Sequence, residues 1–391
     1  MKLILLLFIF FISCSDLNLP LLPDIDGSID DADISIFEDL DTDDSDIYEI
    51  ETTLLVGTVK GYDVPYSGKV FYSVEESISD LKKLEFQGFG SPHGSDIEIS
   101  TWDEGFMVIG RHDSTEINIF HVKDDGDFEI TSFKDESGKY LNFHDGVYNH
   151  LKDEFLFSAN AKDTLFAFKD GIVKKVRISD NENISPSKMR VIGDTLFVAL
   201  LNMDDSFTST KGEISVVSLK DYSFETVELP AKNPVGKIEY NPVFDKNHIY
   251  IACAGSWQKR DGALVRVNIE TFKSESVLKE TSETGSVLNG DFVDVSIADN
   301  GIIYIVFSDN SERWINKLLE FDTVKGTVKE IDSGINAFAA TPLDYSSLTR
   351  KVYYFVDVKH ETYLRSFDTV DKNIEEQLME QAPASLRIWK K

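Results

Sequence analysis

Short runs in which apolar and polar residues alternate make up most of the chain from about Thr53 onwards. Gly, Asp and Asn residues separate these runs. A period of two is typical of β-strands with one buried face, and the period of an amphipathic helix is nearly absent. The pattern therefore predicts an all-β body that extends from residue 53 to residue 391.

One short element, an apolar residue followed by any residue and another apolar residue, recurs along this body. Its copies lie at 97–99, 147–149, 189–191, 238–240, 295–297, 337–339 and 386–388. Successive copies begin about 42 to 57 residues apart, which is the spacing of propeller blades. More apolar and then alternating runs follow each copy, so each repeat supplies four strands. Seven copies predict seven four-stranded antiparallel blades.

The two ends of the body are incomplete in a matching way. Three strands, near 53–59, 68–74 and 80–86, precede the first full blade, and one orphan strand at 385–389 follows the last. Pairing the orphan with the first three completes a blade and removes exposed strand edges. We therefore expect a seven-bladed β-propeller closed by a C-terminal strand; a pair of β-sandwiches would not explain the matching fragments.

The first residues are typical of an export signal. Lys2 precedes the apolar run 3–12, which is shorter than the roughly 20 residues that a transmembrane helix needs. The run ends in Phe11-Ile12-Ser13-Cys14, which resembles the lipobox of bacterial lipoproteins. That resemblance implies a signal peptide at 1–13, lipidation of Cys14 and, because Ser15 follows, an outer-membrane location in the cell envelope. An ordinary secretory leader is the alternative.

An acidic stretch follows at 14–52, without a single Lys, Arg or His. Like charges repel one another, so we expect a disordered tether. The whole chain has 39 basic and 69 acidic residues, a formal charge of −30, which excludes nucleic acid as a partner. The only other cysteine, Cys253, lies in an apolar run, and we expect its free thiol to pack as a small hydrophobe.

Three segments of the middle of the chain carry a family resemblance. Asn233-Pro234-Val235, the run 249–252 and the run 262–268 resemble the repeat of YVTN-type surface-layer and lactonase-like β-propellers. In place of the signature itself stands Tyr250-Ile251-Ala252-Cys253. The resemblance implies the propeller fold and an envelope location, but the family includes both binding scaffolds and enzymes, so it selects no function.

The loops of a propeller emerge on two faces of the disc, and the sequence predicts different chemistry for each. Connections from second to third strands and between blades share one face, where they are long and rich in aromatic and cationic residues. The opposite face carries short acidic hairpins. We therefore expect ligand binding on the long-loop face. The candidate ligand-binding residues are Trp257, Arg260, Arg313, Trp314, Arg111, His93 and His144.

No catalytic motif identifies a reaction. Gly-x-Ser-x-Gly, Walker and dinucleotide-binding motifs are absent from the sequence. His93, His144, Asp145 and Asp291 could in principle ligate a metal, but their spacing does not support it, so we expect no metal or cofactor. The sequence favours an envelope lipoprotein, membrane-bound through Cys14, that acts as a scaffold binding an envelope protein or a small anionic or carbohydrate ligand. The alternative is an envelope enzyme, a lactonase-like hydrolase or a lyase, that uses the long-loop face.

Overall fold

The computed structural model describes most of the predicted body. It covers residues 52–59, 70–74, 76–83, 96–111, 116–123, 128–134, 142–159, 163–204, 206, 208–256, 259–281, 286–309, 315–336, 342–358, 361–379 and 382–390. These all belong to one compact unit, Glu51–Lys391. The predicted signal peptide, Cys14 and the tether lie outside the described residues. Within the described part, no helix is long and apolar enough to cross a membrane.

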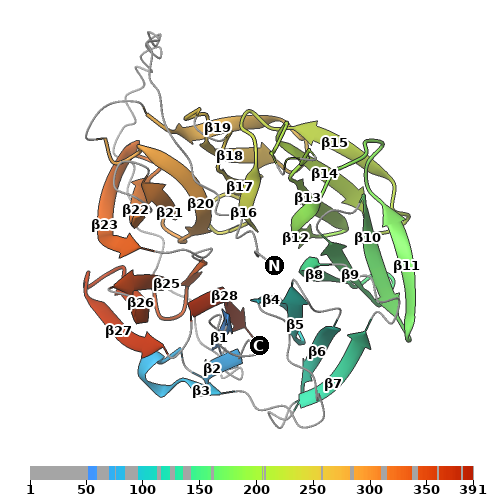
Figure 1. The fold of residues 1–391 in the computed structure, drawn as a ribbon, viewed down its shortest axis with the longest axis horizontal. Coiled ribbons are helices and arrows are strands. Elements are labelled where there is room, and N and C mark those ends of the chain that lie inside the picture. The colour runs from blue at the N-terminus through green and yellow to red at the C-terminus, as the bar shows by residue number, and fades with distance from the viewer. Residues whose placement is uncertain are drawn as a thin grey trace, which may run out of the picture. The chain divides into compact units, whose positions relative to one another are not determined.

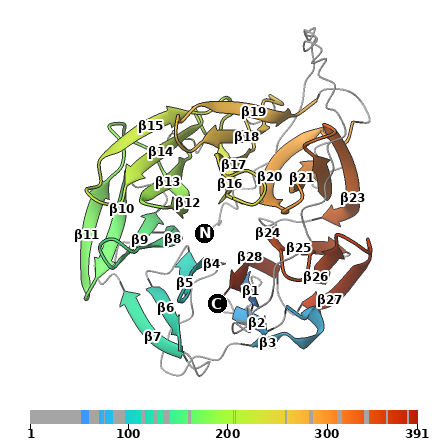
Figure 2. The ribbon, with the colours of Figure 1, turned by 180° about the vertical axis from the view of Figure 1, so that it is seen from behind.

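Seven four-stranded antiparallel sheets are arranged as a ring, as predicted (Figures 1 and 2). Six sheets consist of four consecutive strands each, with the first strand innermost. The fold is therefore a seven-bladed β-propeller. Its strands are β1 Thr52–Val59, β2 Val70–Val74, β3 Lys82–Lys83, β4 Asp96–Trp102, β5 Gly105–Arg111, β6 Glu116–Val122, β7 Phe128–Lys134, β8 Phe143–Asn149, β9 Glu154–Ala159, β10 Thr164–Lys169, β11 Ile172–Arg177, β12 Pro186–Ile192, β13 Thr195–Leu200, β14 Glu213–Ser218, β15 Phe224–Glu228, β16 Pro234–Glu239, β17 His248–Cys253, β18 Ala263–Asn268, β19 Ser274–Lys279, β20 Gly290–Ile297, β21 Ile302–Asp309, β22 Ile315–Asp322, β23 Thr327–Asn336, β24 Leu343–Ser346, β25 Lys351–Val358, β26 Glu361–Asp368, β27 Ile374–Met379 and β28 Ala382–Lys390.

The seventh sheet joins the two ends of the body. Its order is β28-β1-β2-β3, so the last strand is the innermost strand of a blade that the first strands begin. Leu54 pairs with Ile388 and Val56 pairs with Leu386 in an antiparallel register. The predicted closure by a C-terminal strand is confirmed.

The hydrophobic core lies between neighbouring blades rather than at the centre of the ring. One cluster, for example, joins Phe197 and Ile214 of one blade to Ile251 and Val265 of the next. Cys253 belongs to the same cluster, and burial raises the pKa of its thiol far above the ordinary value. The expectation that this thiol packs as a small hydrophobe is confirmed.

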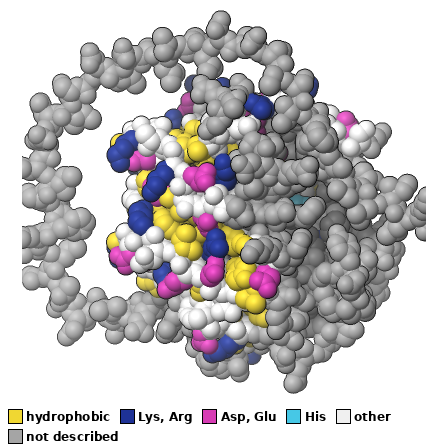
Figure 3. Space-filling view, turned by 60° about the vertical axis from the view of Figure 1, so that its left-hand side comes forward, with side chains coloured by type: hydrophobic (Ala, Val, Ile, Leu, Met, Phe, Trp, Pro, Cys, Tyr) yellow, Lys and Arg dark blue, Asp and Glu magenta, His cyan; other side chains and the backbone are white. Residues whose placement is uncertain are grey.

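The outermost strands face solvent on most of their length. In β11, for example, only Val176 is buried. Figure 3 shows the side of the molecule that lies to the left in Figure 1, where acidic and basic side chains are interspersed with apolar patches. No large area of one charge is visible on the described residues of that side.

The inner strand of the sixth blade corrects one prediction. It is β24, whose Leu343-Asp344-Tyr345 carries the repeat pattern, and not 337–339, which lies outside the described residues. Ala337-Phe338-Ala339 matches the pattern of two apolar residues around any third, but its central residue is apolar, whereas the central residue of the observed strand is Asp344. The sixth blade does have an inner strand, at Leu343–Ser346, and the number of blades is seven as predicted.

Candidate functional site

A cavity of about 860 Å³ lies at the centre of the ring, and all seven inner strands contribute to it. Its mouth is lined by turns that follow the inner strands, with Trp102, His150, Asn241, Ser347 and Lys390 among them. Cavities of roughly 300–1,000 Å³ suit small molecules. The mouth lies on the face of the turns between first and second strands, opposite the long-loop face.

Alternation along the inner strands explains why charged residues line this cavity. In β12, Met189 packs between blades, so Lys188 and Arg190 on either side of it lie on the other side of the strand. In β16, Ile238 packs between blades in the same way, and Lys237 and Glu239 flank it. The inner strands thus turn one side to the core and the other to the channel.

Glu98 is the centre of a first buried ionic group. Its carboxylate lies 2.7 Å from Nζ of Lys188, 2.8 Å from the Arg387 guanidinium and 3.6 Å from that of Arg111. The Glu98 side chain is only 3% exposed. Burial alone would raise the pKa of Glu98, but the three cations together lower it to about 2. Glu98 and Lys188 belong to blades that are separated by a third one, whose inner strand is β8, so their contact joins two non-adjacent blades on the same side of the channel.

Asp145 lies next to this group and anchors the backbone of the neighbouring blade. Its carboxylate accepts hydrogen bonds from the Met189 amide at 2.8 Å, the Gly146 amide at 2.9 Å and the Ser100 hydroxyl. Burial, together with the nearby Glu98, raises the pKa of Asp145 despite the opposing effect of Lys188. The carboxyl lines the cavity, but its hydrogen bonds are used for structure.

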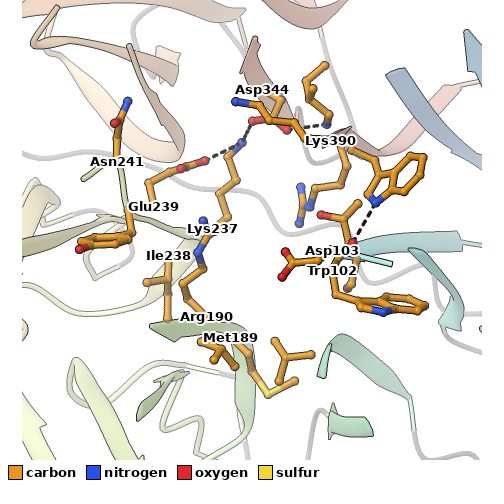
Figure 4. Close-up of a pocket in the computed structure, with 18 of the residues that line it drawn as sticks. Trp102, Asp103, Met189, Arg190, Lys237, Ile238, Glu239, Asn241, Asp344 and Lys390 are labelled. Atoms are coloured by element: carbon orange, nitrogen blue, oxygen red, sulfur yellow. Dashed lines mark hydrogen bonds and ion pairs between the residues drawn. The ribbon is translucent and has the colours of Figure 1, made fainter. Parts of the chain in front are cut away.

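Lys237 is the centre of a second ionic group on the other side of the channel (Figure 4). Its ammonium lies 2.9 Å from Glu239 and 2.8 Å from Asp344, and donates to the carbonyl of Leu343. Asp294 accepts hydrogen bonds from the amides of Lys237, at 3.0 Å, and Leu343, at 3.2 Å. Burial raises the pKa of Glu239 although Lys237 opposes it. One ammonium thus contacts two carboxyl groups, and the charge of a third, that of Asp294, also acts on it.

Arg190 differs from the other cations of the cavity. Lys237 and Arg387 are ion-paired, and Lys390 donates to the hydroxyl of Ser347 at 2.6 Å. Arg190 lines the cavity and its side chain is exposed, and it has no hydrogen-bond or ion-pair partner among the described residues. Figure 4 shows it extending into the cavity from the strand next to Lys237. A planar guanidinium in this position suits a carboxylate or a phosphate.

Trp257, Arg313, Trp314 and His93 lie outside the described residues. Arg111 belongs to the ionic group of Glu98.

Two further predicted residues lie elsewhere on the propeller. The Nδ1 atom of His144 lies 3.4 Å from the Ser187 hydroxyl, and Arg260 is half-buried with a left-handed backbone, φ 48°. Neither of them, nor Arg111, lines the cavity. Their binding role stays a prediction. In the described part of the chain, no group of three or more His, Cys, Asp or Glu residues could hold a metal ion.

Sequence reasoning missed the residues that line the channel, although a signal was present. The central position of the repeat element is charged in four copies, Glu98, Arg190, Glu239 and Arg387, and in the corrected sixth copy it is Asp344. The innermost strand of a blade turns one side to the core between blades and the other side to the central channel. Charged residues that recur on the channel side therefore indicate a polar channel. The repeat predicts the number of blades, and its central residue indicates which side chains line the channel.

Comparisons with known proteins agree with the fold. No family model matches the chain. No curated protein matches it either. A proposed 6-phosphogluconolactonase from Bacteroides fragilis is 12% identical with a TM-score of 0.58, over 88% of this chain and 99% of that one.

Two lyases are also similar in structure. A streptogramin B lyase is 16% identical with a TM-score of 0.53, over 76% of this chain and 87% of that one. Virginiamycin B lyase from Staphylococcus aureus is 15% identical with a TM-score of 0.50, over 73% and 84%. At such identities the likeness shows the fold alone. The chain is a seven-bladed β-propeller similar in fold to these lactonase-like and lyase proteins. The resemblance to YVTN-type propellers has no matching family model and stays a prediction.

Proposed function

We propose that the protein is a binding propeller of the bacterial cell envelope that takes a small ligand into the central cavity. A lipid on Cys14 would hold it to the membrane, and the acidic stretch 14–52 would act as its tether. The ligand would enter between the turns that follow the inner strands. An anionic group of the ligand would bind to Arg190.

The exposed guanidinium of Arg190 is the observation that carries this proposal. The other Lys and Arg side chains of the cavity are engaged with protein partners. Arg190 has none among the described residues, although buried and half-buried carboxyl groups lie nearby. A cation kept unpaired in a cavity of this size is available to a ligand, and an Arg side chain gives a planar, directional contact.

The test is a thermal-stability screen of a small-molecule library that includes carboxylates, sugars, phosphorylated sugars and amino acids. A ligand that binds the folded state stabilises it in proportion to its affinity. The wild-type protein is compared with Arg190→Gln and with Arg260→Gln, a matched change on the long-loop face. We expect hits that bind wild type and Arg260→Gln equally and bind Arg190→Gln about tenfold more weakly, as the loss of a charged hydrogen bond implies.

The rival site makes the opposite prediction. If the long-loop face binds the ligand, Arg260→Gln or Trp257→Ala will weaken binding and Arg190→Gln will leave it unchanged. That result would contradict the cavity proposal and support the residues predicted from the sequence. A screen whose hits depend on neither face would contradict both.

A further inference from the structure

The charges around the channel are divided between two sides. On the side of β4, β8, β12 and β28, the four cations Arg111, Lys188, Arg190 and Arg387 outnumber the two carboxyl groups of Glu98 and Asp145. On the side of β16, β20 and β24, the single cation Lys237 faces the three carboxyl groups of Glu239, Asp294 and Asp344. Along the inner strands, cations therefore predominate on one side of the channel and carboxyl groups on the other, while Asp103, Glu104, Asp299 and Lys390 also line the cavity, nearer its mouth.

Arg190 and Glu239 bring these two excesses face to face inside the cavity. They lie on neighbouring inner strands, and Arg190 is close enough to lower the pKa of Glu239. They nevertheless make no ion pair with each other. One carboxylate oxygen of Glu239 binds Lys237 at 2.9 Å, and its side chain is 15% exposed. A guanidinium and a carboxyl group of opposite charge thus line the same cavity close to each other without forming an ion pair.

The carboxyl group of Glu239 lacks enough positive charge around it. Asp344 shares the ammonium of Lys237, and its second oxygen accepts the Ile388 amide at 2.8 Å. Burial and the charge of Asp344 therefore raise the pKa of Glu239. A cationic group of a ligand at this position would complete the neutralisation that Lys237 begins.

The charge of the whole molecule argues against a ligand that is only an anion. With a formal charge of −30, the chain repels anions, and the repulsion grows with ligand charge. A phosphate monoester carries about two negative charges, whereas Arg190 offers one positive charge. A ligand with no net charge avoids this penalty and can still use both sides of the cavity.

We infer that the cavity binds a zwitterion of the amino-acid type, a free amino acid or a short peptide, with its carboxylate on Arg190 and its ammonium on Glu239. This inference rests on the proposed function and names the class of its ligand. The cavity volume of about 860 Å³ accommodates molecules of this size. Selectivity would come from the requirement that both charges be present, because either unpartnered charge would be left in a partly buried site.

The experiment compares charged and blocked forms of the same molecules on the wild-type protein. The standard amino acids and dialanine are screened by thermal stability, and each hit is titrated calorimetrically beside its N-acetyl and its amide derivatives. We expect at least one free zwitterion to bind, and each blocked derivative to bind about tenfold more weakly because one charged contact is lost. Failure of every zwitterion to bind, or equal binding of the blocked forms, would overturn the inference.

Two variants assign the contacts to their residues. Arg190→Gln should no longer distinguish the free carboxylate from the amide, and Glu239→Gln should no longer distinguish the free ammonium from the N-acetyl form. Glu270→Gln, in an exposed turn away from the cavity, should keep both distinctions. Because the comparison of ligands on wild type needs no variant, misfolding of Glu239→Gln would not decide the outcome.

The two proposals can fail separately. If the library screen finds a sugar or a simple anion that depends on Arg190 while no zwitterion binds, the cavity is the site and the zwitterion is wrong. If no compound of any class depends on Arg190, the proposed function fails and this inference fails with it.

Discussion

At the residue scale, Glu98 is a buried carboxylate whose surroundings strongly favour the ionised form. Three cations surround one carboxylate that is almost completely buried. Removing one member of such a group leaves the others charged and unpaired, and this costs more than the group itself contributes. The stability of the channel therefore depends on keeping Glu98 ionised.

Glu98→Gln should destabilise the protein by roughly 3 kcal/mol, since it leaves Lys188 and Arg387 without their counter-ion. The low pKa of Glu98 adds a pH dependence. Its contribution is complete above the ordinary carboxyl pKa of 4.5 and is lost as the pH falls towards about 2. Denaturant unfolding at pH 7 and at pH 3 measures both effects. Glu275→Gln, which removes an exposed pair with Arg266, is the control and should cost less than about 1 kcal/mol; equal losses in the two variants would contradict the prediction.

The pKa of Glu280, which directly follows β19, is shifted in the direction opposite to that of Glu98. Neither of its carboxylate oxygens makes a hydrogen bond of good geometry with a described residue, and the nearby Gly262 amide opposes the rise in its pKa without preventing it. Its close neighbours are the carboxyl groups of Asp291 and Asp261, and two carboxylates cannot bond to each other without a shared proton. Burial and the charge of Asp291 raise the pKa of Glu280 to about 9.

Glu280→Gln should therefore stabilise the protein in mildly alkaline solution. An acid whose pKa is raised by folding binds its proton more tightly in the native state, so native stability falls as the pH rises from about 4.5 to about 9. The variant should melt several degrees above wild type at pH 8 and at nearly the same temperature at pH 5. Glu270→Gln, in an exposed turn, should show no such difference. A shift of the same size at both pH values would show that packing and not titration is responsible.

The roles of buried charged residues are harder to predict from the sequence than those of buried apolar residues. The burial of Cys253 followed from the apolar run around it, because hydrophobic neighbours in sequence were sufficient to identify a core strand. The roles of Glu98 and Lys237 depend on partners 90 or more positions away, such as Lys188 at 2.7 Å and Asp344 at 2.8 Å. A charged residue within a strand looks like a solvent-facing position until the ring closes around it.

At the scale of the element, the closing strand β28 has two functions. It pairs along β1 and completes the seventh sheet, and its Leu386 is buried among residues of the neighbouring blade, including Phe355 and Leu364. Its Arg387 supplies one of the cations around Glu98. The sequence predicted the pairing, because unmatched fragments at the two ends required it, but not the ionic contact.

Deletion of residues 385–391 should open the ring and lower the melting temperature by about 5–10 °C. Loss of a buried Leu alone costs roughly 2–5 kcal/mol, and a protein of this size loses a few degrees for each kcal/mol. The exposed edge of β1 should also promote aggregation. Scanning calorimetry and light scattering measure the two effects. Lys390→Ala, at the exposed end of the same strand, should behave as wild type, and an unchanged truncated protein would contradict closure by β28.

At the scale of the whole molecule, the sequence determines the ring more completely than its site. Seven repeats and a divided blade are properties of strand order, and short-range alternation reveals them. The central cavity arises only when seven inner strands are placed side by side, so its residues are spread from Ser100 to Lys390. Loop length and aromatic content instead predicted a site on the opposite face, at Trp257, Arg260, Arg313 and Trp314. The binding experiments with variants of the two faces decide between the central cavity and that face.

Attachment to the membrane is the last prediction at this scale, and it depends on a single thiol. If the lipobox at 11–14 is processed, Cys14 carries several acyl chains, and such lipidation holds a protein far more firmly than one chain does. Cys14→Ser should abolish labelling by radioactive palmitate and move the protein from the membrane to the soluble fraction. Cys253→Ser is the matched control, because its buried thiol lies inside the propeller and should leave labelling unchanged. A Cys14→Ser protein that still incorporates palmitate and sediments with membranes would contradict the lipid anchor, whereas loss of labelling together with release into the soluble fraction would support it.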